Sequence, residues 1–216
     1  RGILVSVDSL SQLELYGRLN PGGRVAVRFN TGIGAGHHEK VNTGGEKTKF
    51  AIPAEMAPQV KELLAKYGLK LAGINQHIGS LFLDVETYIA GARKLFQLAR
   101  EFPGLEFIDL GGGFGIPYHP SEKRLDLARL GEGLDKALQE FLAEYDNPEL
   151  TVMIEPGRYV VAEAGLLLGK CHVVKESYGV KYIGTDLGFN VLMRPVLYGS
   201  YHEVEVLKNP ANGGHS

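Results

Sequence analysis

The sequence predicts an α/β fold, with a parallel sheet followed by a smaller antiparallel β region. Over residues 1–157, short apolar runs rich in β-branched residues, such as "GILVSV" and "LEFIDL", alternate with longer segments of helical periodicity. After Arg158, the runs "LLLGKCHVV", "VKYIG" and "SYHEVEVLK" follow one another without intervening helices. The first pattern is typical of strand–helix–strand units with right-handed crossovers, and the second of antiparallel strands.

Five strand–helix units are expected in the first region. The helices between the strands have recognisable ends: Ser9 or Ser11 begins the first, Pro53 begins the second, and Gly68 closes the second. The change of rhythm places a domain boundary close to residue 162, so we expect one domain over 1–162 and a second over 163–216. The strands are expected at residues 2–7, 24–29, 69–78, 105–110 and 150–155.

The composition is that of an ordinary globular chain, with 44% apolar and 22% charged residues among 216. A formal net charge of −2 gives no electrostatic reason to expect nucleic-acid binding. No apolar run reaches the roughly 18 residues of a membrane-spanning helix. Cys171 is the only cysteine, which excludes an intrachain disulfide and indicates a reducing compartment, so we expect a cytoplasmic protein.

Residues that could bind a ligand or take part in catalysis lie at the carboxyl ends of different strands: Arg28, His77, the Gly111–Gly112–Gly113 triplet and Glu155. A (β/α)₈ barrel builds its site from several strand ends, whereas an open doubly wound sheet concentrates its ligand at one switch point. The placement therefore favours part of a (β/α)₈ TIM barrel.

The glycine triplet lies in "DLGGGFGIP". A dinucleotide fingerprint is excluded, because Ile116 stands where the third glycine is needed and Pro117 follows at once. Amides without side chains can form a nest around a phosphate group, as in a mononucleotide or pyridoxal phosphate. A flexible turn is the alternative reading.

Two further motifs are weaker when taken alone. "IEPGR" places Glu155 and Arg158 across a Pro-Gly turn, where they can face one site, although a surface arginine is the simpler reading. "GINQHIGS" places His77 and Ser80 at a strand end, although a lone histidine on a strand is more often a core residue. The adjacent His37 and His38 lack a third ligand at suitable spacing, so we expect no metal site.

Taken together and in this order, these motifs resemble the fold-type III pyridoxal-phosphate decarboxylases, the ornithine/diaminopimelate/arginine group. The resemblance covers essentially the whole chain and includes "NTGIGAGHHEKVNTGGEKTKFAI" and "GTDLGFNVLMRPVLYGSYHEV". It implies an alanine-racemase-like barrel over 1–162, represented by its strands four to eight, and the beginning of a C-terminal β domain over 163–216.

The resemblance also implies roles for individual residues, with pyridoxal 5′-phosphate as the cofactor. His77 would stack on the pyridine ring, Glu155 would pair with the ring nitrogen, and Arg28 would lie near the ring. Arg158 would reach the phosphate or the substrate carboxylate. The phosphate would be held by Ser80, Gly111, Gly112 and Gly113.

The expected activity is that of an amino-acid carboxy-lyase, and within the family the preferred substrate is meso-diaminopimelate, which would be converted to lysine. Arg194 and Tyr198 would bind the carboxylate at the far end of that substrate. Ornithine, arginine or carboxynorspermidine are alternative substrates, and a non-catalytic paralogue or a phosphosugar-binding barrel are alternative functions. The family also implies a homodimer with shared active sites.

The sequence departs from the family pattern in several places. Ala51 stands where a glycine is usual, Asn75 replaces a histidine and Leu81 replaces a glutamine. The Tyr-Ala-x-Lys strand that anchors the cofactor and the Cys-Glu-Ser-Gly-Asp segment of the β domain are not found. We therefore expect an internal fragment of a longer enzyme, inactive by itself.

Overall fold

The computed structural model describes residues 2–34, 45 and 48–207, and His37 and His38 lie outside these residues. The chain divides into two compact units. The barrel unit comprises residues 1–116 and 124–164, and the β unit comprises residues 117–123 and 165–216. Among the described residues, no helix has the length and apolarity needed to cross a membrane.

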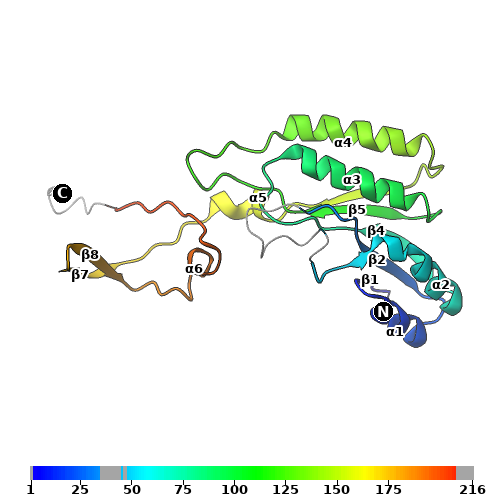
Figure 1. Cartoon of the computed structure of the whole chain (residues 1–216), viewed down its shortest axis with the longest axis horizontal. Helices are drawn as coiled ribbons and strands as arrows, with labels where there is room; N and C mark the ends of the chain where they lie inside the picture. Colours follow the sequence, from blue (N-terminus) through cyan, green and yellow to red (C-terminus); the bar gives the residue numbers. More distant parts are fainter. Residues whose placement is uncertain (1, 35–44, 46–47, 208–216) are drawn as a thin grey trace. The chain divides into compact units, whose positions relative to one another are not determined.

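The barrel unit contains the parallel sheet that the sequence predicts (Figure 1). All neighbouring strands pair in parallel, and a two-residue strand, β3 (Ile52–Pro53), adds to the end of β2. The strand order β1-β2-β4-β5-β6 follows the chain, as in one arc of a (β/α)₈ barrel. The main strands are β1 (Val5–Val7), β2 (Arg24–Asn30), β4 (Lys70–Asn75), β5 (Phe107–Gly112) and β6 (Thr151–Glu155).

Local signals set the ends of the first two helices. The Ser9 side chain accepts a hydrogen bond from Gln12 N and begins α1 (Leu10–Leu19). One 3₁₀ turn, η2 (Ala54–Met56), follows Pro53 and leads into α2 (Ala57–Tyr67). Gly68 ends α2 in the left-handed conformation, with φ 62°.

The next two helices lie side by side against the sheet (Figure 1). Aspartates begin both: Asp84 caps α3 (Val85–Ala99), and Asp126 caps α4 (Leu127–Leu142). Phe96 of α3 stacks on Phe141 of α4 with ring centroids 5.0 Å apart. α3 also buries most of its apolar residues in the common core and contacts β5, so β5 rests on a well-packed layer.

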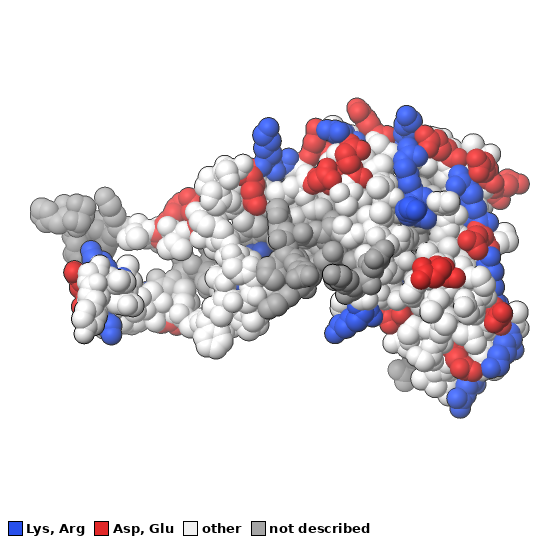
Figure 2. Space-filling model, in the orientation of Figure 1, with Lys and Arg blue, Asp and Glu red and all other residues white. Residues whose placement is uncertain are grey.

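On the face that Figure 2 shows, acidic and basic side chains are interspersed over the barrel unit. Several of them form ion pairs between neighbouring elements, such as Arg93 with Glu140 and Arg129 with Glu86. Pairs of this kind are exposed, so they contribute little to stability.

The β unit contains an antiparallel hairpin, β7 (Cys171–Ser177) and β8 (Val180–Thr185), joined at Tyr178 and Gly179. Two expectations for this part of the chain were wrong. The segment "SYHEVEVL" forms no strand over residues 200–207, and a short helix, α6 (Arg194–Tyr198), occurs between the expected strands. The short helices α5 (Arg158–Val161) and η3 (Ala162–Ala164) follow β6 and belong to the barrel unit. Alternating apolar residues alone do not make a strand, because a strand also needs a hydrogen-bonding neighbour.

Candidate active site at the strand ends

The carboxyl ends of parallel strands meet at one edge of the sheet, and most of the expected site residues lie there. Cross-strand register places Arg28 of β2 beside Asn75 of β4, and Asn75 beside Asp109 of β5. His77 follows two residues after the end of β4, although the sequence suggested a position within the strand. Glu155 is the last residue of β6.

Gly111 lies at a bulge near the end of β5. Four residues of β5, from Asp109 to Gly112, span the same length as three residues of β6, from Met153 to Glu155. Gly111 has φ 75°, and its N–H donates to Asp109 Oδ1 at 2.9 Å. The chain therefore turns here in a conformation that favours glycine.

The glycine triplet also lets three strand ends approach closely. A Cβ atom on Gly111 would overlap the carbonyl oxygen of Gln76, and one on Gly112 would overlap that of Glu155. A Cβ atom on Gly113 would overlap the carbonyl oxygen of Gly79. The close approach of the strand ends is therefore enough to explain why glycine occupies all three positions.

Two of the triplet's amides already have partners inside the protein. Gly111 N donates to Asp109, and Gly112 N donates to His77 Nδ1 at 3.2 Å. The expected phosphate contacts of Ser80, Gly111, Gly112 and Gly113 stay a prediction. Ser80 is half-buried in the loop that follows β4, close in sequence to His77.

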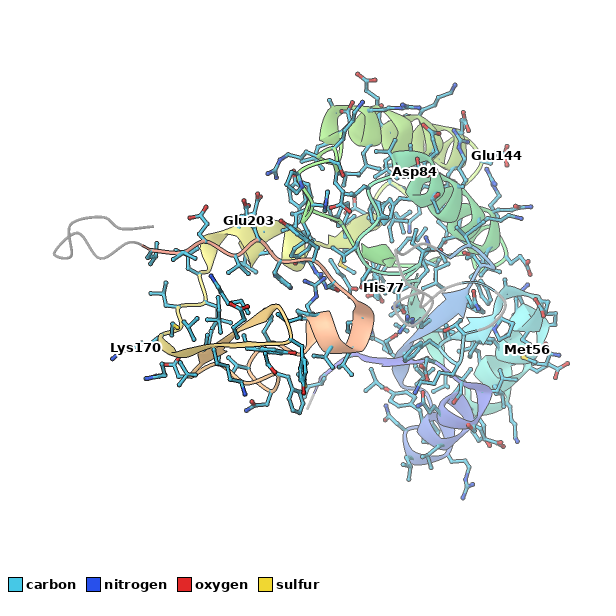
Figure 3. The ribbon with its side chains drawn as sticks, turned by 60° about the vertical axis from the view of Figure 1, so that its left-hand side comes forward. Met56, His77, Asp84, Glu144, Lys170 and Glu203 are labelled. Carbon is cyan, nitrogen blue, oxygen red and sulfur yellow. The ribbon has the colours of Figure 1, made fainter. Side chains whose placement is uncertain are left out.

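His77 is held as a neutral ring. Burial lowers the pKa of His77, and the positive charge of Arg28 lowers it further, although Asp109 acts in the opposite direction. Since Nδ1 accepts the hydrogen bond from Gly112 N, the proton of the neutral ring lies on Nε2. The ring is half-buried, and Figure 3 shows it beside the sheet, whereas the labelled Asp84 and Glu144 lie at the helices.

Arg28 brings a cation to the same edge. Its guanidinium carbon lies 5.3 Å from the centre of the Phe50 ring. Its Nε atom is buried and has no hydrogen-bond partner among the described residues. A buried guanidinium donor without an acceptor is costly, so this position suits an anionic ligand oxygen.

Glu155 and Asp109 form a carboxyl pair. Asp109 is buried, with 9% of its surface exposed, and it lies on the same face of the sheet as Glu155. Partial desolvation raises the pKa of Glu155, the neighbouring Asp109 carboxyl group raises it further, and Arg28 lowers it. Sequence reasoning missed Asp109, although an acid inside the apolar run "FIDLG" was a signal, because a buried carboxylate is costly unless it has partners.

The remaining expected residues fall in two places. Arg158 begins α5 in the barrel unit, three residues after Glu155. Arg194 and Tyr198 belong to α6 of the β unit, and their part in this site stays a prediction. Within that unit, Arg194 donates to His202 Nε2 at 2.9 Å, and its guanidinium carbon lies 4.4 Å from the centre of the Tyr118 ring.

Among the described residues, no three or more histidine, cysteine, aspartate or glutamate side chains lie close enough together to hold a metal ion. The donor set at the strand ends instead combines a flat neutral imidazole, a buried guanidinium and a carboxyl pair. This set fits an aromatic ligand that carries an anionic group and a basic ring nitrogen.

Comparison with known proteins gives two family matches. Residues 2–162 match the pyridoxal binding domain of the pyridoxal-dependent decarboxylases. Residues 158–215 match the C-terminal sheet domain of the pyridoxal-dependent decarboxylases. The two matches together span nearly the whole chain.

Individual relatives agree with these matches. The chain is 41% identical to a diaminopimelate decarboxylase of Methanothermobacter thermautotrophicus, over 97% of this chain and 50% of that protein. A crystal structure of diaminopimelate decarboxylase superposes with a TM-score of 0.85 at 34% identity, covering 93% of this chain and 48% of that one. The Helicobacter pylori diaminopimelate decarboxylase complexed with L-lysine superposes with a TM-score of 0.80 at 30% identity, covering 92% and 50%. The chain thus spans about half the length of the relatives it matches.

Proposed function

Because the chain belongs to the pyridoxal-dependent decarboxylases, we propose that its strand-end site binds pyridoxal 5′-phosphate and that the protein converts meso-2,6-diaminopimelate to L-lysine and CO₂. The observation that carries the cofactor proposal is the convergence of His77, Arg28 and Glu155 on one edge of the sheet. The substrate proposal rests on the relatives, which are diaminopimelate decarboxylases, one of them a complex with L-lysine.

The residues present fit the cofactor in chemical type. The neutral ring of His77 offers a flat surface for stacking on the pyridine ring. The buried Nε of Arg28 lacks an acceptor among the described residues, and an anionic oxygen of the cofactor would provide one. Glu155 would pair with the ring nitrogen. The residues proposed for the phosphate are Ser80, Gly111, Gly112, Gly113 and Arg158.

When bound, the cofactor supplies an electron sink for the electron pair that remains at Cα after CO₂ leaves. The chain's own residues contribute orientation and charge. Glu155 would hold the proton of the ring nitrogen in place, and His77 would fix the plane of the ring. Correct alignment of the breaking bond is a large part of the rate that an enzyme can supply.

Substrate choice is proposed to depend on Arg194 and Tyr198. The substrate diaminopimelate carries a second carboxylate, which an arginine can bind through two parallel hydrogen bonds. Arg194 lies over the Tyr118 ring and donates to His202, so its guanidinium is already oriented within the β unit. Ornithine ends in an amine and would favour an acidic residue at this position.

The proposal is tested by measuring CO₂ release and product formation with the full product of the natural gene. We expect lysine and CO₂ from meso-diaminopimelate, and much slower release from ornithine or arginine. Arg194→Leu should raise KM for diaminopimelate, because it removes the partner of the distal carboxylate. As a matched control, Arg129→Leu on the exposed surface of α4 should leave KM unchanged. Faster release from ornithine or arginine would contradict the substrate proposal.

A further inference from the structure

We propose that Asp109 is a positioning residue of the strand-end site, whose carboxyl group shares one proton with Glu155 and so presents Glu155 as an acid to an incoming ring nitrogen. The proposal deepens the function proposed above and rests on it, because it assumes that the ligand of this site carries a basic ring nitrogen. Asp109 is a buried acid, and none of the cofactor contacts proposed above involves it.

Strand geometry brings the two carboxyl groups together. Asp109 of β5 lies beside Met153 of β6, and Glu155 follows Met153 by two residues. Since side chains alternate along a strand, Asp109 and Glu155 point to the same face of the sheet. Register places Asn75 and Arg28 on that face as well.

The Asp109 carboxyl group is fixed from its own strand. Its Oδ1 accepts the N–H of Gly111, and Tyr88 Oη donates to the Gly111 carbonyl oxygen at 2.8 Å. The bulge is therefore held on both sides of Gly111, and Tyr88 is fully buried. A carboxyl group in such a setting has little freedom to turn away from Glu155.

Two carboxylates that face each other on neighbouring strands disfavour double ionisation, and Asp109 raises the pKa of Glu155 accordingly. A single proton between them would let one carboxyl group donate to the other, because two carboxylates can only accept. Three charged or titratable groups face the pair from the elements around it: Arg28 from β2, His77 after β4 and Tyr88 from α3. Arg158 begins the helix that follows β6. The neutral His77 and Tyr88 add no charge, so Arg28 faces a pair that carries one negative charge.

The transfer that follows is balanced without any further reactant. When the ring nitrogen enters the site unprotonated, the O–H bond of the Glu155 carboxyl group would break, and its proton would form an N–H bond with the lone pair of that nitrogen. No atom is oxidised or reduced, and the Glu155 carboxylate then accepts a hydrogen bond from the new N–H. The ion pair is thus formed inside the site, which avoids carrying two separate charges out of water.

The first test is a pH titration of the Glu155 side-chain carbonyl by ¹³C NMR in the ligand-free full chain, with Glu155→Gln used for assignment. The wild-type midpoint should lie above that of an ordinary glutamate. Asp109→Asn keeps the Oδ1 acceptor for Gly111 N, but its amide can donate to a Glu155 carboxylate. The midpoint should therefore fall toward the ordinary value in Asp109→Asn.

Two control variants separate charge from structure. Tyr88→Phe removes the other hydrogen bond to the bulge but leaves both carboxyl groups, so the Glu155 midpoint should stay at its wild-type value. Asp135→Asn removes a carboxylate from the exposed side of α4 and should also have no effect. An unchanged midpoint in Asp109→Asn would overturn the proposal. If Asp109→Asn does not fold, the wild type alone decides. A wild-type Glu155 midpoint equal to that of an ordinary glutamate would overturn the proposal.

The second test uses pyridoxine 5′-phosphate, which has the ring nitrogen and phosphate but no aldehyde. Its binding is measured by calorimetry in two buffers of different ionisation enthalpy, at a pH between the two NMR midpoints. Asp109→Asn should take up about one more proton from the buffer per ligand than the wild type, because its Glu155 is already ionised. Equal proton uptake would overturn the transfer. If the probe does not bind, the transfer fails together with the proposed function, whereas the NMR midpoints still decide whether the proton is shared.

Discussion

The barrel unit and the β unit both contain apolar strands, but the two bury them very differently. In the barrel unit, the central strands β2, β4 and β5 contribute buried residues to one continuous core with α3 and α4. In the β unit, every residue of β7 and β8 is exposed. Backbone pairing therefore forms a strand in either unit, but only crossover helices cover the apolar side chains. Arg28 and Asp109 lie on strands with this covering, whereas β6, which carries Glu155, is mostly exposed.

The largest expected effect comes from emptying a core position in the barrel unit. Leu95 of α3 is completely buried, so Leu95→Ala should lower the free energy of unfolding by about 2–5 kcal/mol. Ile183 of β8 is 60% exposed, so Ile183→Ala should change it by less than about 0.5 kcal/mol. Urea unfolding followed by circular dichroism measures both. Similar losses for the two variants would remove the distinction between the units.

A second prediction concerns the glycine bulge at the edge of the site. Gly111 and Gly104 have nearly the same positive φ, 75° and 78°, but a Cβ atom has open space only at Gly104. Gly104→Ala should therefore lower the free energy of unfolding by about 1–2 kcal/mol, because only the left-handed conformation is unfavourable there. Gly111→Ala adds the overlap with the Gln76 carbonyl oxygen and should cost about 2–5 kcal/mol in total.

These two variants are compared by the same urea unfolding. Equal costs at the two positions would show that the strand ends can move apart. In that case, close packing would not explain the triplet.

A third prediction is a gain of stability at Ala51. This residue has φ 71°, a conformation that is unfavourable for any side chain. Ala51→Gly relieves this strain but increases the freedom of the unfolded chain, so the net gain should be about 0.5–1 kcal/mol. As the opposite control, Ala65→Gly in the exposed part of α2 should cost about 1 kcal/mol. A loss at Ala51 in thermal unfolding would contradict the strain argument.

The smallest effect is expected for an exposed charge of the barrel unit. Arg24 and then Lys70 lower the pKa of Glu106. A lowered pKa gives stability that is present above the ordinary pKa of a glutamate and is lost as the pH falls through the lowered value. Glu106→Gln should therefore slightly lower the free energy of unfolding at pH 7 and leave it unchanged in strong acid. In 1 M salt, the variant and the wild type should be equally stable at pH 7. An effect that persists in acid would point to a role other than ion pairing.

Most of the barrel unit could be predicted from the sequence because its local signals agree with its packing. Ser9 begins α1 and Gly68 ends α2, as their residue types suggest. The alternation of strands and helices also fixes the order of the parallel strands, since crossovers of this kind join neighbours. The β unit lacks such constraints, and the expected third strand over residues 200–207 is not formed.

The site was predictable only in part. Strand-end residues such as Arg28 and Glu155 could be found, because parallel strands end at a common edge. Asp109 was not assigned, since the pattern of apolar residues does not show which residues of β6 share a face with an acid in β5. Ala51 and Leu81, which differ from the residues usual in the family, both adopt positive φ, 71° and 64°.

Cofactor binding at the strand ends is tested most directly by a crystal structure of the full chain with pyridoxine 5′-phosphate. We expect the ring against His77, the ring nitrogen at Glu155 and the phosphate beside the glycine triplet. A ligand bound away from the strand ends, or a ring nitrogen turned away from Glu155, would contradict it.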